Sequence, residues 1–282
     1  MSGHRAIDRF LLFDARDRSR WRPFLAELRA QRFELVIDLQ RILKSGVITR
    51  ASGAPHRLGF DRARCKEGSW LFTNAKVPPN ASPGVTVAQY LEFADFLECP
   101  PAAPSWELPF EPFPRSAPGR PRVIVNVGAT KLANRWYADA WARVCDALVR
   151  EFDAEVHLTG GPSDRDETAE VARLASVPLV DQAGKLSLKQ SAGLIASARL
   201  FIGCDTGPLH IAAAVGTPCV ALFGAADPRR TGPFGPEHAV VTHPVACSPC
   251  RRRECNVAGH PCMADLAPER VLERARAALA AP

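Results

Sequence analysis

The sequence has 282 residues, of which 46% are hydrophobic, as expected for one or two globular domains. This composition excludes a disordered or collagen-like chain. The longest nearly apolar run, residues 211–223, is shorter than the roughly 20 apolar residues of a membrane-spanning helix. The first residues lack the apolar core of a secretory signal. We therefore expect a cytoplasmic protein without a membrane span.

The net charge of +6 is unevenly distributed. Residues 1–65 contain 14 Lys+Arg against 7 Asp+Glu, whereas the remaining residues contain 22 against 23. A basic face attracts anionic partners, although a solvated arginine-rich surface explains the same excess. The basic residues form no long run and no pattern interleaved with aromatics, so we expect no nucleic-acid partner.

Residues 1–99 predict an alternation of strands and helices. Residues 35–39 form an apolar run typical of a buried parallel strand. The other expected elements are strands at 9–14, 56–61 and 71–77 and helices at 21–31 and 87–97. Residues 100–121 follow, with eight of the 25 prolines, and predict a linker between two domains.

Residues 122–282 predict a second α/β series. Strands are expected at 122–127, 155–158, 178–181, 200–203, 219–223 and 239–242. Helices are expected at 136–150, 164–175, 188–197, 208–215 and 268–280. This order predicts a doubly wound parallel sheet, in which a ligand binds at the carboxyl ends of the strands.

The most informative residues follow the strand at 200–203. Asp205, Thr206 and Gly207 form a turn into a helix, and His210 lies in its first turn. A helix N-terminus presents unpaired N–H groups and partial positive charge, which suits a phosphate, and glycine allows close approach. The alternative is that Asp205 and Thr206 only cap the helix.

Several segments together resemble the heptosyltransferases, glycosyltransferase family nine, which add heptose from ADP-heptose to the lipopolysaccharide inner core. The matching segments are IDLQ to LKS at 37–45, GFDR at 59–62, KEGSWLF at 66–72, VNVGAT at 125–130, NRW at 134–136, GGPSD at 160–164 and DTGPLHIAAAVGTPCVALFG at 205–224. The resemblance implies an α/β fold of the GT-B type, with two Rossmann-like domains. Residues 1–99 would bind the acceptor, 100–121 would link the domains, and 122–282 would bind the nucleotide sugar.

The resemblance assigns a donor site. Asp205, Thr206, Gly207 and His210 match the loop that contacts the diphosphate and sugar, and Ala129 and Thr130 match the turn that faces the diphosphate. Asp164 stands where the family has a carboxylate for the ribose, and Leu186 lies beside the adenine. The family's Lys-x-Trp-Pro element is changed to Asn134, Arg135, Trp136 and Tyr137, so Lys131 or Arg135 would supply the cation. No metal or other cofactor is implied.

The general base is missing from the sequence pattern. Family members carry it in a Gly-Asp loop after their first strand, and this chain contains no Gly-Asp dipeptide. The resemblance therefore implies an incomplete amino-terminal domain, and the catalytic residue stays unassigned. Asp14, at the end of the expected first strand, is an alternative base. A second hypothesis is a catalytically inactive remnant that binds a nucleotide sugar without transferring it.

The acceptor would be anionic, like the phosphates and carboxylates of a lipopolysaccharide core. The basic residues in the matching segments of the first domain, Lys44, Arg57, Arg62 and Lys66, are candidates to bind it, although exposed surface charge explains each of them equally well. A lipid-linked acceptor also implies peripheral contact with the cytoplasmic face of the inner membrane.

Four cysteines cluster near the end of the chain, at Cys247, Cys250, Cys255 and Cys262, with His260 nearby. Four thiolates could hold a structural metal, but only the first Cys-x-x-Cys fits common zinc spacings. A redox-sensitive loop and plain structural cysteines are the alternatives, and we assign no metal to the site.

Overall fold

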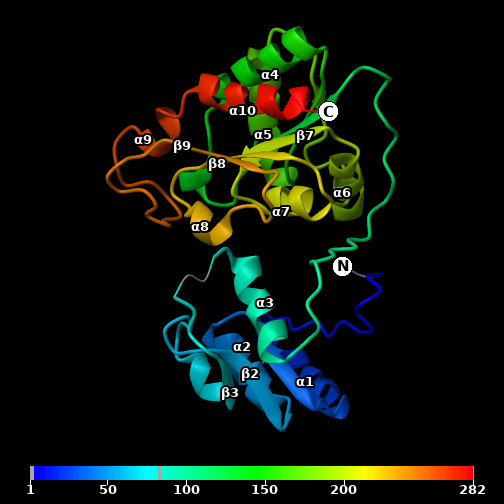
Figure 1. The fold of residues 1–282 in the computed structure, drawn as a ribbon, viewed down its shortest axis with the longest axis vertical. Helices are drawn as coiled ribbons and strands as arrows, with labels where there is room; N and C mark the ends of the chain where they lie inside the picture. Colours follow the sequence, from blue (N-terminus) through cyan, green and yellow to red (C-terminus); the bar gives the residue numbers. More distant parts are fainter. Residues whose placement is uncertain (1–2, 82–83, 282) are drawn as a thin grey trace. The chain divides into compact units, whose positions relative to one another are not determined.

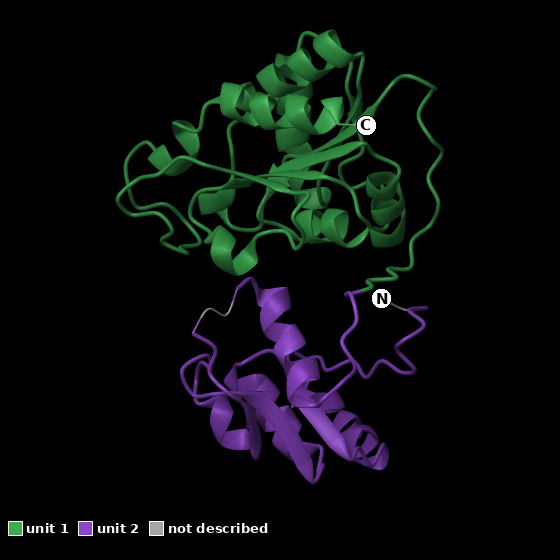
Figure 2. Cartoon of the chain, in the orientation of Figure 1, with its two compact units in different colours: residues 1, 105–282 green, residues 2–104 purple. Residues whose placement is uncertain are grey.

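The computed structural model describes residues 3–81 and 84–281. It divides into two compact units, one ending at residue 104 and one beginning at residue 105 (Figure 2). The boundary falls inside the proline-rich stretch, and each unit contains its own parallel sheet (Figure 1). Within the described residues, no helix combines the length and apolar content that crossing a bilayer requires.

The second unit is built on a six-stranded parallel sheet with the order β6-β5-β4-β7-β8-β9. Its strands are β4 (Arg122–Asn126), β5 (Glu155–Thr159), β6 (Val180–Asp181), β7 (Leu200–Cys204), β8 (Cys219–Phe223) and β9 (Ala239–Thr242). All residues of β4, β7 and β8 are buried, which explains their continuous apolar sequences. The chain therefore forms the predicted doubly wound sheet.

Helices cover both faces of this sheet (Figure 1). Val123 and Val125 of β4 point into one core, which also contains residues of α4 (Ala138–Phe152), α5 (Arg165–Leu174) and α10 (Pro268–Ala280). Ile124 points into the other core, with residues of α6 (Leu188–Ala196) and α7 (Gly207–Ala214). Alternate side chains of one strand thus serve opposite layers.

Residues 105–121 pack against the second unit. The Glu111 amide donates to the Lys189 carbonyl at 3.2 Å, and a Cβ atom on Gly193 would lie only 1.7 Å from the Glu111 carbonyl oxygen. The buried Arg122 guanidinium donates to the Pro114 carbonyl at 2.6 Å. This extended segment is therefore an integral part of the carboxyl-terminal unit, over the surface of α6.

The first unit has a three-stranded parallel sheet, β1-β2-β3, formed by β1 (Leu35–Asp38), β2 (His56–Phe60) and β3 (Ala75–Val77). The helices are α1 (Trp21–Ala30), α2 (Leu43–Ala51) and α3 (Thr86–Phe96), with short 3-10 turns at Arg18–Arg20 and Ser69–Phe72. Its largest buried cluster comprises Leu58, Phe60, Val77 and Phe93.

Three predictions for the first unit were wrong. Residues 9–14 form no strand, and the expected strand at 71–77 is a 3-10 turn followed by the shorter β3. The strand at 35–39 exists, but Leu35 and Ile37 are 37% and 38% exposed instead of buried. β1 lies at the edge of a sheet of three strands, and the side of the strand that carries Leu35 and Ile37 is only partly covered. α2 was not predicted, because Gly46 and β-branched residues weaken its helical pattern.

In the second unit the predicted strands and main helices all form, with ends shifted by one or two residues. The short helices α8 (Pro228–Thr231) and α9 (Pro261–Ala264) were not predicted. Between β9 and α9 lies an irregular loop, residues 243–260, which carries three of the four clustered cysteines.

A buried carboxylate fastens this loop to the sheet. Asp227 follows β8 and is only 5% exposed, and its oxygens lie 3.1 Å from both the Arg229 and Arg251 guanidinium groups. The Ser248 hydroxyl and the Arg251 amide also donate to the Gly224 and Ala225 carbonyls, at 2.5 and 2.7 Å. The hydrogen bond from Arg229, reinforced by Arg251, lowers the pKa of Asp227 to about 2.

We expect hydrogen exchange to distinguish the two units. The first unit has a small core and exposed apolar side chains on β1, so its amides should open at lower free energy. Amides of β1–β3 should exchange faster than those of β4, β7 and β8 when the intact chain is measured by mass spectrometry. Equal protection of both sheets would contradict this prediction.

The Asp227 ion pairs predict an acid-dependent loss of stability. Because folding lowers this pKa, the carboxylate stabilises the native state above its unfolded pKa of about 4, and the contribution disappears as the pH falls toward 2. The loss should amount to about 2 kcal/mol. The free energy of unfolding, measured with urea at several pH values, should show this loss in the parent and in the exposed control Asp166→Asn, but not in Asp227→Asn. An identical pH profile for Asp227→Asn and the parent would refute it.

Candidate functional site

A hollow of about 510 Å³ opens at the carboxyl ends of the strands in the second unit. It lies where the strand order changes direction, between β4 and β7, since the chain runs outward from β4 to β5 and β6 and returns to β7 on the other side. Ligands of doubly wound sheets bind at this switch point, where loops from both directions separate.

Polar groups from the two central strands meet at the base of this hollow. The Asn126 side-chain amide donates to the Gly128 carbonyl at 3.1 Å and to the Thr206 hydroxyl oxygen at 3.4 Å. The Thr159 hydroxyl in turn donates to the Asn126 side-chain oxygen at 3.3 Å. Asn126 is 2% exposed, so this chain of hydrogen bonds fixes the loops that follow β4, β5 and β7.

Two helix N-termini face the hollow. Thr206, Gly207 and Pro208 begin α7, and Ser187, Leu188 and Ser191 line the opposite side at the start of α6. The Ser187 side chain accepts a hydrogen bond from the Gln190 amide, whereas the α7 N-cap, Thr206, makes no such side-chain bond. The first amides of α7 are therefore left for a ligand, and both helix dipoles favour an anion.

Asp164 closes another side of the hollow. It accepts a hydrogen bond from the Gly161 amide at 2.7 Å, and a Cβ atom on Gly128 would lie 2.2 Å from its carboxylate. Arg135 lies 3.5 Å from Asp164, pairs with Glu167, and donates to the Ala129 carbonyl at 3.0 Å. Gly128 is therefore required for the close packing of its loop against Asp164.

The structure brings together most of the predicted donor-site residues. Those that line the hollow are Ala129, Thr130, Arg135, Asp164, Leu186, Thr206 and Gly207. Lys131, Asp205 and His210 lie outside the lining. Among the described lining residues Arg135 is the only cation, and it is already paired with carboxylates.

His210 and Asp205 form a pair of their own beside the α7 N-terminus. The His210 ring nitrogen lies 3.7 Å from the Asp205 carboxylate. The Asp205 side chain is 13% exposed and that of His210 is 46% exposed. The imidazole thus lies close to a carboxylate and remains accessible to a ligand.

Several lining residues were missed from the sequence. Asn126 and Thr159 belong to strand ends whose side-chain direction only the register reveals, and Ser187 and Ser191 lie on a helix far along the chain. The Ser187-x-x-Gln190 capping box was a readable signal for the start of α6.

A larger hollow, of about 710 Å³, lies at the opposite edge of the same unit. Residues 115–122 and 196–199 line it, at the amino ends of β4 and β7. Phe152, Ala196 and Leu279 bring the carboxyl ends of α4, α6 and α10 to this space. Because ligands of doubly wound sheets bind at the carboxyl ends of the strands, the smaller hollow is the better ligand site.

The four predicted acceptor residues do not form one group. Lys44 and Lys66 are both exposed. Their segments adjoin each other, since the Leu43 amide donates a hydrogen bond to the Glu67 carboxylate at 3.1 Å. Arg62 is exposed after β2 and lies over Trp70, with its guanidinium carbon 5.2 Å from the ring centroid. Arg57 is at the other end of β2, about 16 Å along the strand, and donates to the Ala54 and Phe72 carbonyls at 2.6 and 3.1 Å.

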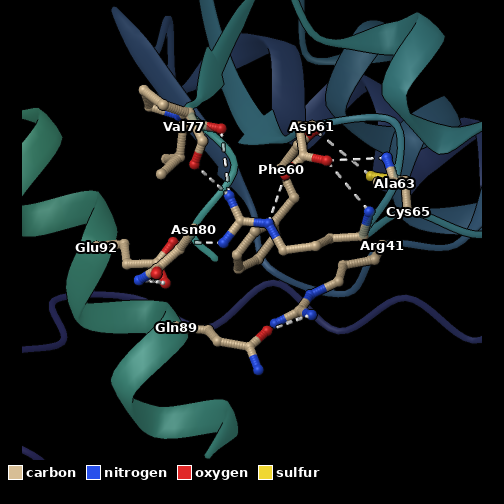
Figure 3. Close-up of polar contacts among 11 residues, drawn as sticks. Arg41, Phe60, Asp61, Ala63, Cys65, Val77, Asn80, Gln89 and Glu92 are labelled. Carbon is tan, nitrogen blue, oxygen red and sulfur yellow. Dashed lines mark hydrogen bonds and ion pairs between the residues drawn. The ribbon is translucent and has the colours of Figure 1, made fainter. Parts of the chain in front are cut away.

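An arginine that was not predicted, Arg64, joins several segments of this unit, and Figure 3 labels Asp61, Val77 and Glu92 among its partners. The guanidinium of Arg64, whose side chain is 11% exposed, contacts Asp61 at 2.5 Å, Glu92, and the Pro78 carbonyl at 2.7 Å. Burial alone would raise the pKa of Asp61, but the hydrogen bond and charge of the Arg64 guanidinium, together with the Ala63 and Arg64 amides, lower this pKa overall. Arg64 therefore joins the loop after β2 to α3, and these contacts explain its position without a ligand.

Asp14 is exposed and does not end a strand, so the premise for considering it as a base was wrong. Its carboxylate accepts from the Arg16 amide at 2.9 Å, and its carbonyl accepts from the Trp21 indole at 3.2 Å. It shapes the turn before α1.

All nine cysteines lie in the described residues and are free thiols. Burial raises the pKa of Cys204 and Cys219 to about 12 and that of Cys262 to about 11. In residues 3–81 and 84–281, no three or more His, Cys, Asp or Glu side chains are grouped closely enough to hold a metal ion.

Comparison with known proteins identifies relatives with this arrangement. The family model for glycosyltransferase family 9 (heptosyltransferase) matches residues 21–260. A lipopolysaccharide core heptosyltransferase, OpsX, of Haemophilus influenzae is 27% identical over 79% of this chain and 67% of its own length. Lipopolysaccharide heptosyltransferase 1 of Pseudomonas aeruginosa is 29% identical over 83% of this chain and 66% of its own. The chain thus spans about two thirds of the length of these relatives.

Solved structures share the fold at lower identity. A glycosyl transferase of family 9 from Veillonella parvula has a TM-score of 0.76 and 18% identity, covering 97% of this chain and 82% of its own. Escherichia coli heptosyltransferase WaaC with ADP has a TM-score of 0.70 and 19% identity, covering 94% and 79%. The fold is α/β, of the GT-B type. Because the family model matches far more than half of the sequence, the chain belongs to glycosyltransferase family 9, the heptosyltransferase family.

Proposed function

We propose that this protein transfers a heptose from ADP-heptose to the anionic inner core of a lipopolysaccharide acceptor, at the cytoplasmic face of the inner membrane. The observation that carries the proposal is the hollow between β4 and β7, toward which the N-termini of α6 and α7 point. Membership of family 9 supports the reaction class, and the similarity to lipopolysaccharide heptosyltransferases supports the sugar and the acceptor.

The diphosphate would bind at the start of α7. Gly207 presents its amide without a side chain in the way, since no atom lies within 4 Å of where its Cβ would be. The Thr206 hydroxyl is held nearby by Asn126. These donors would stabilise the negative charge that develops on the diphosphate as the bond to the sugar breaks.

The remaining lining residues fit the nucleoside. Asp164 would accept hydrogen bonds from the ribose hydroxyls, and Leu186 would pack beside the adenine. Arg135 is balanced by Asp164 and Glu167, so its main contribution would be to hold Asp164 in place. Lys131, just outside the lining, remains as a second cation for the diphosphate.

Transfer forms a bond between the acceptor oxygen and the sugar carbon and breaks the bond from that carbon to the diphosphate. The acceptor hydroxyl must also lose its proton to a base. Asp164 is held by Gly161 and Arg135, and Asp14 lies in a surface turn, so we assign neither to this step. On the acceptor side, Lys44, Arg62 and Lys66 are the exposed cations that we propose to meet the anionic core, and Arg57 is more occupied by backbone carbonyls.

The direct test is transfer from ADP-heptose to a deacylated core oligosaccharide, followed by mass spectrometry of the acceptor. A mass increase by one heptose unit supports the proposal. If the protein binds ADP but transfers no heptose, and a version that includes additional upstream coding sequence behaves in the same way, the result would instead favour a nucleotide-sugar-binding protein without catalysis.

His210→Ala is expected to weaken ADP binding by about 1–3 kcal/mol, the range for losing a hydrogen bond to a charged group. Its side chain is largely exposed and packs against little, so the melting temperature should stay unchanged. Calorimetric titration and thermal melts on the same preparations measure the two effects. His56→Ala, at an exposed histidine of the other unit, is the matched control. Parent-like ADP affinity in His210→Ala would remove this residue from the site.

Two glycine substitutions should separate structure from ligand contact. Gly128→Ala would push against Asp164 and should lower both stability and ADP affinity, since the loops must move apart. In Gly207→Ala the added methyl group would have no atom within 4 Å, and residue 207 already belongs to a helix, so the fold should tolerate this substitution. The added methyl group would nevertheless obstruct the amide that we assign to the diphosphate, and affinity for ADP should fall at least tenfold, about 1.4 kcal/mol. Unchanged ADP binding by Gly207→Ala would place the diphosphate elsewhere.

A further inference from the structure

A basic surface lies next to the candidate donor site in the carboxyl-terminal unit. It consists of Arg229 and Arg230 of α8 and of Arg251, Arg252 and Arg253 of the loop 243–260, all of them exposed. We refer to these five residues as the arginine surface. The acidic residues within the same two segments are the buried Asp227 and the exposed Glu254, so positive charge predominates.

Contacts within the unit establish that these arginines are neighbours. Arg229 and Arg251 share the Asp227 carboxylate, each at 3.1 Å, although they are far apart in the sequence. Only part of each guanidinium is used, because their side chains are still 83% and 57% exposed. Two residues after Arg251, the Arg253 carbonyl accepts a hydrogen bond from the Ala133 amide at 3.0 Å. The loop thus extends from α8 to the turn after β4.

Exposed apolar residues border the arginine surface at this turn. Leu132 precedes Ala133 and is 51% exposed, and Tyr137 is 41% exposed, with its ring centroid 6.2 Å from that of His260. Val257 is 40% exposed, and its carbonyl accepts from the His260 amide at 3.2 Å. Leu132, Tyr137 and Val257 form what we call the apolar rim.

This combination has the chemistry of a bilayer interface. Arginines bind lipid phosphates in a bidentate manner, and an anionic leaflet attracts clustered basic residues near its surface. Aliphatic side chains and a tyrosine with its polar end can enter the headgroup region beside them. If the arginine surface were only a solvated charged surface, exposed apolar side chains would not be needed beside the arginines.

We propose that the arginine surface and the apolar rim dock this protein on an anionic phospholipid bilayer. Thr130 lines the donor hollow and lies only two positions before Leu132, so docking would hold the mouth of that hollow close to the headgroups. This inference rests on the proposed function, because the lipid-linked acceptor proposed there would lie in the same bilayer. It adds the surface through which the nucleotide-binding unit itself contacts the membrane.

The experiment is co-sedimentation of the full chain with vesicles. One set contains phosphatidylcholine alone, and the other contains phosphatidylcholine and phosphatidylglycerol in equal parts. We expect binding to the anionic vesicles that decreases as salt is raised, and much weaker binding to the neutral ones. The double variant Arg252→Glu/Arg253→Glu should lower affinity for anionic vesicles at least tenfold, because two attractive charges become repulsive.

The matched control is Arg115→Glu/Arg274→Glu, which changes the net charge equally at two exposed arginines outside this surface. An equal loss of binding in the control would mean that only net charge matters, and would overturn the assignment. Parent-like binding by Arg252→Glu/Arg253→Glu would overturn it too. A further pair, Leu132→Ser/Val257→Ser, should weaken the binding that persists at high salt, and no change there would remove the apolar rim from the surface.

Two further measurements separate this inference from its alternatives. Calorimetric ADP titration of Arg252→Glu/Arg253→Glu should match the parent, because these arginines lie outside the donor hollow. If the parent protein binds ADP but does not bind anionic vesicles, the docking surface is rejected and the proposed donor site stands. Loss of ADP binding in the parent with intact vesicle binding rejects the donor site instead. A duplex oligonucleotide serves as a competing polyanion: binding to it through the same arginines, without vesicle binding, would show a nucleic-acid surface and refute bilayer docking.

Discussion

After β4 and β7 the chain continues to opposite faces of the sheet, and this divergence determines where the second unit forms its hollow. From β4 the chain crosses to α4 on one face of the sheet, whereas from β7 it enters α7 on the other. The loops must therefore diverge at the carboxyl ends of these two strands. The space that opens there is lined by backbone groups at helix starts, and Asn126 fixes both loops from below.

This arrangement can attract an anion without concentrating charge in the protein. Arg135, the cation in the lining, is neutralised by Asp164 and Glu167, and the helix N-termini provide partial charges that need no counterion. Beyond the carboxyl end of β8, by contrast, positive charge is concentrated. Asp227 pairs there with Arg229 and Arg251, and Arg252 and Arg253 are exposed on the surface of the loop. One edge of a single sheet thus carries two kinds of anion-attracting surface, one built from backbone and one from side chains.

The sequence predicted the second unit better than the first, for a physical reason. β4, β7 and β8 are buried on both faces, so their apolar runs identify them without knowledge of their neighbours. In the first unit, Leu35 and Ile37 show the same apolar pattern on a strand that is only partly covered, and α2 combines Gly46 with β-branched residues. Asp205–Gly207 was predictable because a turn and a helix start are local features. Asn126, Thr159 and Ser191 were not, since strand register and helix placement bring them to the hollow.

The close contact between Glu111 and Gly193 defines where this unit can be separated from the rest of the chain. Composition suggests a cut before Arg122, where the prolines end, but the guanidinium of Arg122 would then lose the Pro114 carbonyl and α6 would lose the strand-like cover over Gly193. A stand-alone fragment of this unit would therefore have to retain the proline-rich segment from residue 105 onward. The prolines suit this task, because a rigid extended segment loses little conformational entropy when it is laid along a helix.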